Sequence, residues 1–362
     1  MDGALIIDKP AGWTSHDVVA RVRRVLWERR VGHTGTLDPF ATGVLVVLVG
    51  RATRLAQFLA GAEKEYEATV RFGYATETGD LTGARRAETT TAGDATAADD
   101  ATATRDATGD AAMGDAATGD KATEDVAMGD GATGAQSPCV GWGRDEVERA
   151  LESLRGEIEQ VPPMYSAKKV AGRKLYELAR RGVEVERAAV RVRVRELEVL
   201  EEAGGAWLRA NEDGTCDMRV RVACSAGTYV RVLAEDLGAR LGAGAHLSAL
   251  RRTRAGTFGL ATAVTLETLA ERVEAGGLGE LLITPDAMLP DLPFVHLTAE
   301  DARRARHGAA IGVAREIGSR WRDGERVRLR DGAAGNLIAV GVYDATNGRL
   351  QPRVMLDAGD EK

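Results

Sequence analysis

The chain has 362 residues, which suggests one large domain plus a smaller one, or two to three domains, and 44% of them are hydrophobic, enough for a core. Its three cysteines form no CxxC pair, and their spacing fits neither a zinc site nor a disulfide framework. No apolar run approaches the roughly 20 residues of a membrane span, and no charged-then-apolar leader is present, so we expect a cytoplasmic protein.

The formal net charge of −7 is concentrated in one segment. Residues 87–140 hold eleven acidic and two basic side chains, which leaves 46 basic and 44 acidic residues in the rest of the chain. The overall charge therefore does not argue against a nucleic-acid partner, because the distribution of charge decides that question.

The first elements predicted along the chain are a strand over residues 3–9 and an amphipathic helix with Ser15 as its candidate N-cap. Apolar residues then recur at helical spacing up to Leu26. A Gly- and Thr-rich loop, GHTGTLDPFATG, precedes the fully apolar run VLVVLV, which is typical of a buried strand. Clean alternation from Lys64 to Tyr74 predicts a half-buried strand, with Tyr66 on its apolar face.

Residues 87–140 interrupt this pattern. They consist mainly of Ala, Thr, Gly and Asp, with a five-residue repeat visible in TGDAA, MGDAA and TGDKA. Such a segment cannot bury enough apolar surface to offset the entropy lost on ordering, so we expect a disordered surface insertion. The calcium-binding β-helix repeat is a nonapeptide, so the Gly-Asp repeats are not expected to bind calcium.

Helical and strand patterns return after the insertion. An amphipathic helix is predicted from Asp145 through Ile158, strands with alternating valines follow near 190–194 and 218–224, and another helix begins near Thr228. Beyond Pro285 a proline-rich linker leads to a segment with one short helix and several strands. This helix spans Ala299 to Arg306, and the strands centre on Val327, Ile338 and Met355.

The loop GHTGTLDPFATG carries the strongest chemical signal. Asp38 precedes Pro39, which restricts its backbone, and the glycines of the loop allow tight turns or close approach of a ligand. A carboxylate held in a partly apolar loop can act as nucleophile, general base or electrostatic stabiliser. Its commoner role in a Gly/Thr loop is to stabilise a turn or cap a helix, and the loop matches no common phosphate-binding motif.

Six motifs in order resemble those of the TruB family of tRNA pseudouridine synthases. They are GALIIDKPAGWTSHDVV, RVGHTGTLDPFATGVLVVLVGRATRL, KEYEATVRFG, VPPMYSAKKVAGRKLYELARRG, CSAGTYVRVLAEDLG and GAHLSALRRTRAGTF. The resemblance implies an α+β fold. A mixed β-sheet catalytic domain with flanking helices would comprise residues 1–86 and 141–285, interrupted by the acidic insertion at 87–140. A small C-terminal β-rich, PUA-like RNA-binding domain would comprise residues 294–358.

The resemblance also implies an isomerase that converts uridine 55 in the T loop of tRNA to pseudouridine. Asp38, in GTLDP, would be the essential catalytic residue. The bond from ribose C1′ to uracil N1 would be cleaved and the base rejoined through C5, without a cofactor or metal. The target nucleotide would have to be flipped out of the folded loop. The partner would be the tRNA T stem-loop, and the enzyme a monomer with no obligate protein partner.

Four further residues would surround the flipped uridine. Tyr66 would lie against the base and could also move the C5 proton, and Tyr229 and Leu250 would line the same pocket. Arg231 would pair with the catalytic carboxylate and hold it ionised. Without the resemblance, Tyr66 and Leu250 would be interpreted as core residues and Arg231 as a surface residue of a first helical turn.

Three other positions are implied at the edge of the site. His33, in GHTG, would contact displaced T-loop nucleotides, although a loop histidine bonded to backbone is an equally good interpretation of the residue alone. Lys9, in DKP, would support the site or be purely structural. Tyr165, in PPMYSA, would form a pocket wall or lie just behind it.

Three groups of arginines could neutralise RNA phosphates, although a solvated basic face is the usual explanation for such groups. They are Arg21, Arg23, Arg24, Arg29 and Arg30; Arg251, Arg252 and Arg254; and Arg303, Arg304 and Arg306.

Two alternatives to catalysis on free tRNA remain open. One is a non-catalytic RNA-binding or RNA-folding module, against which the intact GTLDP, KEY and GTYVR motifs argue. The other is a guide-RNA-dependent pseudouridine synthase, although the wording of GHTGTLDPFATG and PPMYSA is closer to the stand-alone form.

Overall fold

The computed structural model describes residues 1–86, 141–166, 168–170, 172–202, 204–332 and 335–357. The insertion predicted at 87–140 lies outside the described residues. Within them, none of the helices combines the length and the apolar character needed to cross a membrane.

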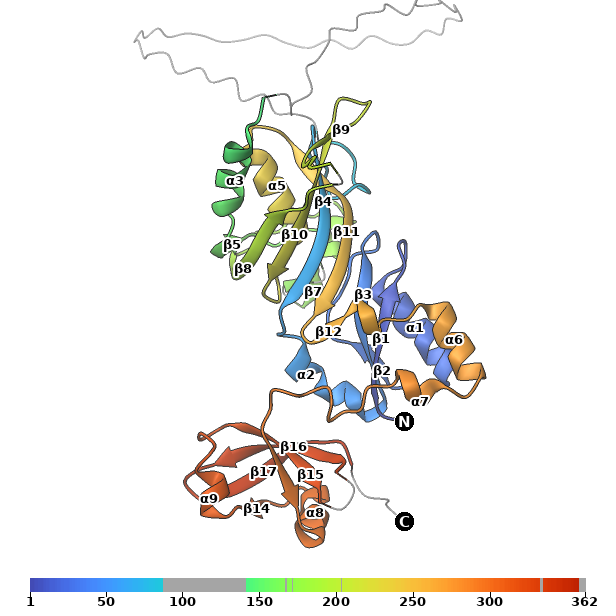
Figure 1. The fold of residues 1–362 in the computed structure, drawn as a ribbon, viewed down its shortest axis with the longest axis vertical. Coiled ribbons are helices and arrows are strands. Elements are labelled where there is room, and N and C mark those ends of the chain that lie inside the picture. Colours follow the sequence, from blue (N-terminus) through green and yellow to red (C-terminus); the bar gives the residue numbers. More distant parts are fainter. Residues whose placement is uncertain (87–140, 167, 171, 203, 333–334, 358–362) are drawn as a thin grey trace, which may run out of the picture. The chain divides into compact units, whose positions relative to one another are not determined.

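The strands before residue 260 form a ten-stranded mixed sheet (Figure 1). Its main path runs in the order β1-β3-β11-β4-β10-β8-β5, and β2, β9 and β12 pair at its sides. The strands are β1 (Gly3–Lys9), β2 (Val31–His33), β3 (Thr42–Val49), β4 (Lys64–Phe72), β5 (Gly156–Gln160), β8 (Val190–Val199), β9 (Arg209–Ala210), β10 (Cys216–Cys224), β11 (Ala245–Ala255) and β12 (Phe258–Gly259). Most neighbours are antiparallel, but β11 pairs with the start of β3 in parallel, which makes the sheet mixed.

Helices pack on the sheet through three hydrophobic clusters. The helices of this part are α1 (Ser15–Leu26), α2 (Ala56–Leu59), α3 (Arg144–Glu152), α5 (Val230–Arg240), α6 (Leu266–Glu274) and α7 (Leu278–Leu281), with short 3-10 turns η1 (Gly50–Leu55) and η2 (Leu260–Thr262). The first cluster joins α3 and α5 to β4, β8, β10 and β11, and the second joins α1 and α6 to β1 and β3. The third cluster is formed by the side chains on the other face of β1 and β3, and it includes residues of η1.

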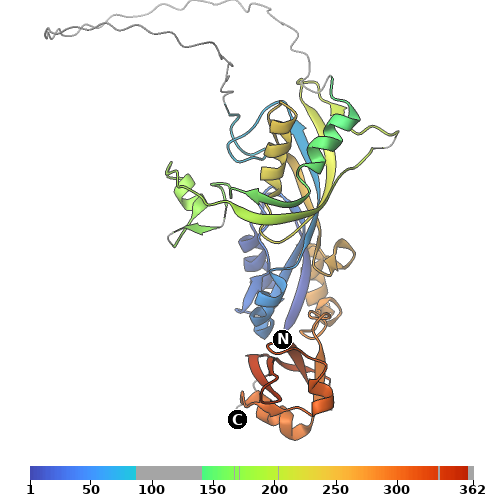
Figure 2. The same ribbon diagram turned by 90° about the vertical axis from the view of Figure 1, so that its left-hand side faces the viewer.

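A short excursion separates β5 from β8. It contains the two-stranded sheet of β6 (Lys169–Val170) and β7 (Arg173–Lys174), followed by α4 (Leu175–Ala179). In Figure 2 this light-green segment extends away from the ribbon of the main sheet. Its connection to the sheet runs through residues 161–166, of which Ser166 lines the functional site described below.

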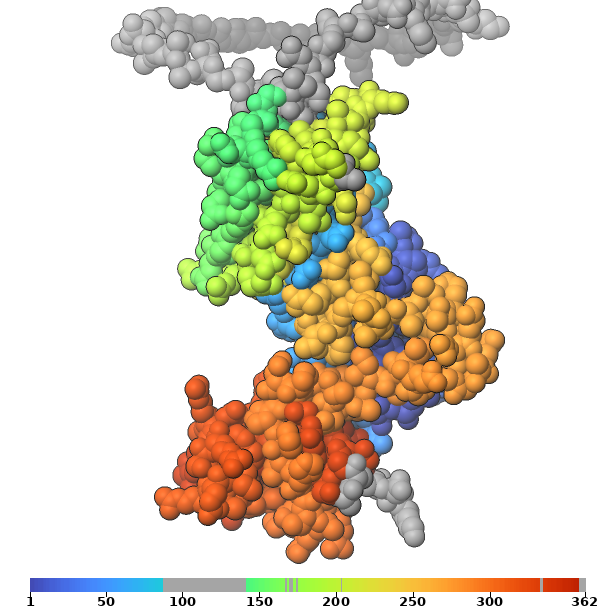
Figure 3. Space-filling model, in the orientation of Figure 1, coloured from blue at the N-terminus to red at the C-terminus, as the bar shows by residue number. Residues whose placement is uncertain are grey.

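The C-terminal segment folds around a five-stranded sheet in the order β13-β15-β16-β17-β14. Its elements are β13 (Phe294–Leu297), α8 (Ala299–Arg306), β14 (Ile311–Gly312), α9 (Arg315–Gly318), β15 (Arg326–Asp331), β16 (Leu337–Asp344) and β17 (Arg349–Met355). It has its own hydrophobic cluster and forms a continuous packed surface, orange to red in Figure 3. The α+β class and the β-rich C-terminal part are therefore confirmed, and the latter is consistent with a PUA-like domain.

Three local predictions were wrong. The N-cap of α1 is Thr14 rather than Ser15, because Thr14 and Asp17 form a reciprocal capping box. The helix predicted to reach Ile158 ends at Glu152, and Ile158 lies in β5, whose first residue, Gly156, has a φ of +82°. Cys224 is buried and free as expected, but Cys216 is disulfide-bonded.

Candidate active site

The loop that carries Asp38 connects β2 to β3 and is fixed on both sides of this residue. Before it, the Ser15 hydroxyl accepts a hydrogen bond from the Leu37 N–H at 2.9 Å and donates to the Leu37 carbonyl at 3.2 Å. After it, the Pro39 carbonyl accepts from the Gly12 N–H at 2.8 Å. The carboxylate is thereby presented from a rigid backbone, which is what a reacting group requires.

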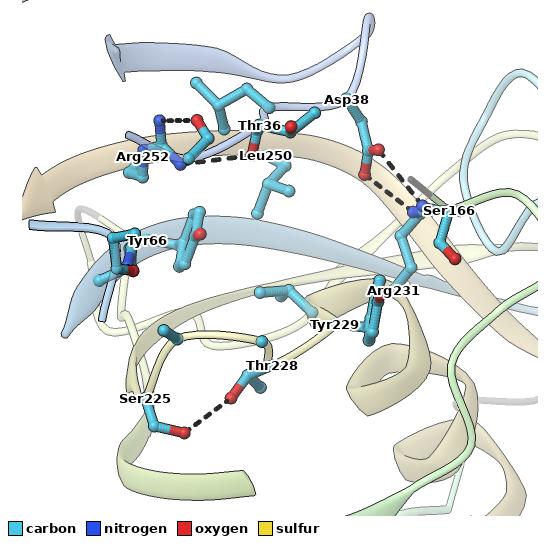
Figure 4. A pocket seen from close by; sticks show the side chains of 17 residues that line it. Thr36, Asp38, Tyr66, Ser166, Ser225, Thr228, Tyr229, Arg231, Leu250 and Arg252 are labelled. Carbon is cyan, nitrogen blue, oxygen red and sulfur yellow. Dashed lines mark hydrogen bonds and ion pairs between the residues drawn. The ribbon is translucent and has the colours of Figure 1, made fainter. Parts of the chain in front are cut away.

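Arg231 binds both oxygens of the Asp38 carboxylate. Its Nε donates to Oδ2 at 2.9 Å and its Nη2 to Oδ1 at 3.2 Å, as the dashed lines in Figure 4 mark. The same guanidinium donates to the carbonyls of Thr78 at 2.6 Å and Tyr165 at 2.8 Å, and Asp80 lies 3.9 Å from it. Arg231 is only 4% exposed, and the two carbonyls and Asp80 fix its orientation and, through it, that of Asp38.

Opposing effects act on the pKa of the Asp38 carboxyl. Burial is the largest and raises the pKa above its ordinary value, and the nearby Asp80 carboxylate acts in the same direction. The charge and hydrogen bonds of Arg231 lower it, as does Lys9. The net direction is upward, so Asp38 is a stronger base than a carboxylate in water while its partner favours the ionised form.

A cavity of about 240 Å³ opens beside this ion pair. Tyr66 on β4 and Leu250 on β11 are both buried and form one wall, and Tyr229 contributes to the other (Figure 4). The strands β4 and β11 are adjacent, with Leu250 opposite Ala68, so the sheet itself sets the width of this wall. Aromatic and aliphatic walls with charged groups at one end suit a planar, polar ring.

Arg252 lines the pocket, although its position between other arginines in the sequence suggests a surface residue. It is 2% exposed and donates to three main-chain carbonyls, those of Val44 at 2.6 Å, Gly35 at 3.2 Å and Thr36 at 3.4 Å. Among the described residues these carbonyls are its hydrogen-bond acceptors, and no carboxylate is found paired with it. Arg252 therefore ties the loop of Asp38 to the sheet while it leaves a positive charge at the pocket wall.

Lys64, at the start of β4, is a second buried cation in the pocket. Its ammonium donates to the carbonyls of Ala60 and Ala62, and burial lowers its pKa to about 8. The pocket is thus lined by three cationic side chains, Lys64, Arg231 and Arg252, and by a single carboxylate, Asp38. This excess of positive charge suits an anionic ligand such as a nucleotide.

Comparisons with known proteins match most of the chain. A family model described as the N-terminal domain of TruB family pseudouridylate synthases matches residues 23–113 and 117–230. A second, the C-terminal domain of tRNA pseudouridylate synthase B, matches residues 231–285. The chain belongs to the TruB family of pseudouridylate synthases.

Relatives and solved structures agree with this assignment. A tRNA pseudouridine synthase B of Geobacillus thermodenitrificans is 43% identical and covers 86% of each chain. The protein of the same name from Ralstonia nicotianae is 38% identical and covers 97% of this chain and 92% of its own. The structure of a Cbf5-Nop10-Gar1 complex is similar with a TM-score of 0.59 at 25% identity, and covers 97% of this chain and 83% of that one.

The structure of this TruB family chain brings five of the predicted site residues to one pocket: Asp38, Tyr66, Tyr229, Arg231 and Leu250. They come from the β2–β3 loop, β4, the start of α5 and β11. Arg252 and Lys64 also line the pocket but were not predicted there. The sequence could have indicated Arg252, because it lies two positions after Leu250 on the same strand and so faces the same side of the sheet.

His33, Lys9 and Tyr165 do not line the pocket. Burial and the nearby charges of His16 and Arg252 lower the pKa of His33 to about 4, so its ring is neutral, and its buried Nδ1 has no hydrogen-bond partner among the described residues. The backbone carbonyl of Tyr165 binds Arg231, so its position lies just behind the pocket.

Lys9 contacts the backbone beside the catalytic loop rather than the cavity. It is completely buried, and its ammonium donates to the carbonyls of Trp13 at 2.7 Å, Pro10 at 2.9 Å and Pro39 at 3.2 Å. Burial lowers its pKa to about 8, although Asp38 acts in the opposite direction. Of the two roles considered for Lys9, these contacts favour the purely structural one.

Two of the three arginine groups do not form free basic surfaces. Arg251 is paired with Asp8 at 2.7 Å, Arg254 is paired with Glu63 and Glu65, and Arg252 is buried. In the C-terminal group, Arg306 binds Asp331 and Asp357, and Arg304 lies 3.5 Å from Asp301. In the N-terminal group Arg23 donates to the Val31 carbonyl at 2.7 Å, and no ion pair of this group is found among the described residues.

Proposed function

We propose that this chain isomerises uridine to pseudouridine in tRNA, at position 55 of the T loop, with Asp38 as its catalytic carboxylate. The relatives named tRNA pseudouridine synthase B support the reaction and the class of substrate. The observation that carries the proposal is the bidentate Arg231–Asp38 pair at the edge of a pocket that has the walls for a single base.

The reaction needs a base that is removed from its stack and held beside a carboxylate. Tyr66 and Leu250 would hold the flipped uracil on one side, and Lys64 and Arg252 would stabilise nearby phosphate or carbonyl oxygens. Arg231 would hold Asp38 ionised and aligned, so that little reorganisation is needed when the reaction begins.

The steps balance without an external reductant or oxidant. The bond from C1′ to N1 breaks and its electron pair leaves with the uracil, while Asp38 either attacks the sugar or removes a ribose proton. The uracil then turns and C5 bonds to C1′; this displaces Asp38 from the sugar in the first route, and in the second Asp38 returns the ribose proton. C5 then loses its hydrogen as a proton, and N1 gains one. Both routes require an ionised carboxylate at the position of Asp38.

The domain roles are part of the same proposal. Residues 1–86 and 141–285 would form the catalytic domain, and residues 294–358 would bind RNA outside the T loop. We also propose that the protein acts as a monomer in the cytoplasm, without a guide RNA, a protein partner or a cofactor. A Cbf5-Nop10-Gar1 complex is among the similar solved structures, so the alternative that depends on a guide RNA or on partner proteins is tested together with this proposal.

The test uses the purified chain alone with an unmodified tRNA transcript, followed by nucleoside analysis of the products. We expect about one pseudouridine per tRNA, which disappears when uridine 55 of the transcript is replaced by cytidine. Binding of the transcript without product would favour the non-catalytic or the guide-dependent alternative instead.

A further inference from the structure

Trp27 is the most exposed large hydrophobic residue of the described chain, with 95% of its surface accessible. It is also the only described residue other than glycine with a positive φ, 53°. It occupies the C-cap of α1, where its N–H donates to the Arg23 carbonyl. Glycine or asparagine is usual at such a left-handed position, because a side chain there is strained.

An exposed tryptophan in a strained conformation contributes nothing visible to the core. Both properties favour a role in binding, because strained backbone conformations cluster at functional sites and exposed apolar side chains often form interaction sites. The ring lacks a packing partner in the aromatic contacts of the described residues, in contrast to Trp142 and Trp321, which pack on Phe72 and Tyr343.

Three exposed arginines lie within three residues of Trp27 along the chain. Arg24, Arg29 and Arg30 are exposed, and among the described residues no side-chain ion pair or hydrogen bond is found for them. The only nearby carboxylate in this turn, Glu28, accepts the N–H of Arg30 at 2.8 Å. The turn thus combines one exposed aromatic ring with three exposed arginines and a single carboxylate, a net positive charge.

The same helix connects this turn to the active-site loop. Its first residue, Ser15, binds both backbone groups of Leu37, and the helix then runs 12 residues to Leu26. At 1.5 Å per residue the turn lies about 18 Å along the helix from the loop of Asp38. On its other side it leads directly into β2 and His33. An RNA whose uridine occupies the pocket is long enough to contact both places.

We propose that Trp27, with Arg24, Arg29 and Arg30, forms a second contact site for the substrate RNA. The indole stacks on an unpaired base, and the arginines bind the phosphates on either side of it. Aromatic faces between cationic side chains are the usual construction for binding unpaired nucleotides. The inference rests on the proposed function, because it takes the tRNA substrate as the ligand.

The decisive variants remove the ring without harming the turn. Trp27→Gly and Trp27→Asn suit the left-handed backbone, so both should raise the thermal midpoint of unfolding. Both should weaken binding of an unmodified tRNA transcript by about tenfold, the effect of one lost stacking contact. Trp27→Phe keeps an aromatic face and should bind within about threefold of the wild type.

The arginines are tested through salt dependence. Removing Arg29 or Arg30 should reduce the slope of log affinity against log salt concentration by about one each. Arg144→Ala is the matched control, since the Arg144 guanidinium is already paired with Glu201, and it should leave the slope unchanged.

The proposal is overturned if Trp27→Gly binds the transcript as tightly as the wild type, or if it loses affinity only together with stability. A change in oligomeric state with unchanged tRNA affinity would also overturn it and assign the surface to self-association. These outcomes are distinct from failure of the proposed function, which would appear as absence of pseudouridine formation by the wild type.

Discussion

The guanidinium of Arg231 is hydrogen-bonded to both carboxylate oxygens of Asp38, a residue 193 positions earlier in the chain. Asp38 lies in the loop before β3, whereas Arg231 is the second residue of α5, so the pair forms only when the sheet and its covering helix are assembled. Arg231 also binds two backbone carbonyls, which prevents it from following Asp38 if the loop moves.

Replacing Arg231 should therefore change the pH dependence of the reaction. Asp38 acts as a carboxylate, so activity falls as the pH drops through its pKa, and the Arg231 charge lowers that pKa. With Arg231→Met the acidic limb of kcat/KM should move to higher pH by about 1–3 units. Arg231→Lys keeps the charge but not the two-point contact, so it should lose turnover with a smaller shift of the limb. An acidic limb that stays in place in Arg231→Met would contradict this interpretation.

Lys9 should affect stability in a pH-dependent way. Lys9→Met leaves carbonyls near Pro39 without a donor and should lower the free energy of unfolding at pH 7 by about 1–3 kcal/mol. Burial lowers the pKa of Lys9 from 10.5 to about 8, so between these values the unfolded chain holds more protons than the folded one. Wild-type stability should therefore rise, relative to Lys9→Met, as the pH increases through that window.

Denaturant unfolding at several pH values measures this difference, and Lys64, whose pKa is lowered in the same way, is common to both proteins and cancels. A stability difference that is constant or falls between pH 8 and 10.5 would show that the Lys9 ammonium is not desolvated in the folded state.

Arg252 should be a positioning residue for the loop of Asp38. Arg252→Met leaves the carbonyls of Gly35, Thr36 and Val44 without their donor, and should cost about 2–4 kcal/mol of stability. Turnover should fall further than tRNA binding, because the loop is loosened beside the reacting carboxylate. Arg252→Lys should restore part of the turnover, and a fully active Arg252→Met would exclude this role.

The acidic segment should be dispensable for catalysis. Deletion of residues 88–138 removes eleven acidic and two basic side chains, so tRNA should bind more tightly at low salt while turnover is retained. The gain should disappear near 1 M salt, where the Debye length is about 3 Å. A variant of the same length with the acids changed to amides is the control for charge alone. A folded deletion variant without activity would refute the prediction.

Periodic patterns predicted the elements that rest on local sequence. The apolar spacing before Leu26 gave α1, and the alternation around Tyr66 gave β4, because burial on one face repeats with the geometry of the element. The error at the N-cap was avoidable, since Asp17 lies three residues after Thr14, as a capping box requires.

Contacts between residues far apart in the chain were harder to predict from the sequence. Arg252 lies in the string LRRTR, which looks like a basic surface, and only the pairing of β11 between β3 and β4 buries it below the active-site loop. The meeting of Asp38 with Arg231 was expected from the family resemblance, since no local pattern relates a loop to a helix so far along the chain. Ile158 fits a helical spacing, but the positive φ of Gly156 ends that continuity.

The catalytic role of Asp38 is the central claim, and release of tritium from C5-labelled uridine in an unmodified tRNA transcript tests it most directly. Wild-type protein and Asp38→Asn should bind the transcript with similar affinity. Only the wild type should release tritium, at about one equivalent per tRNA labelled at position 55 alone. Comparable release by Asp38→Asn would contradict the assignment of Asp38, and binding without release by the wild type would contradict the proposed reaction.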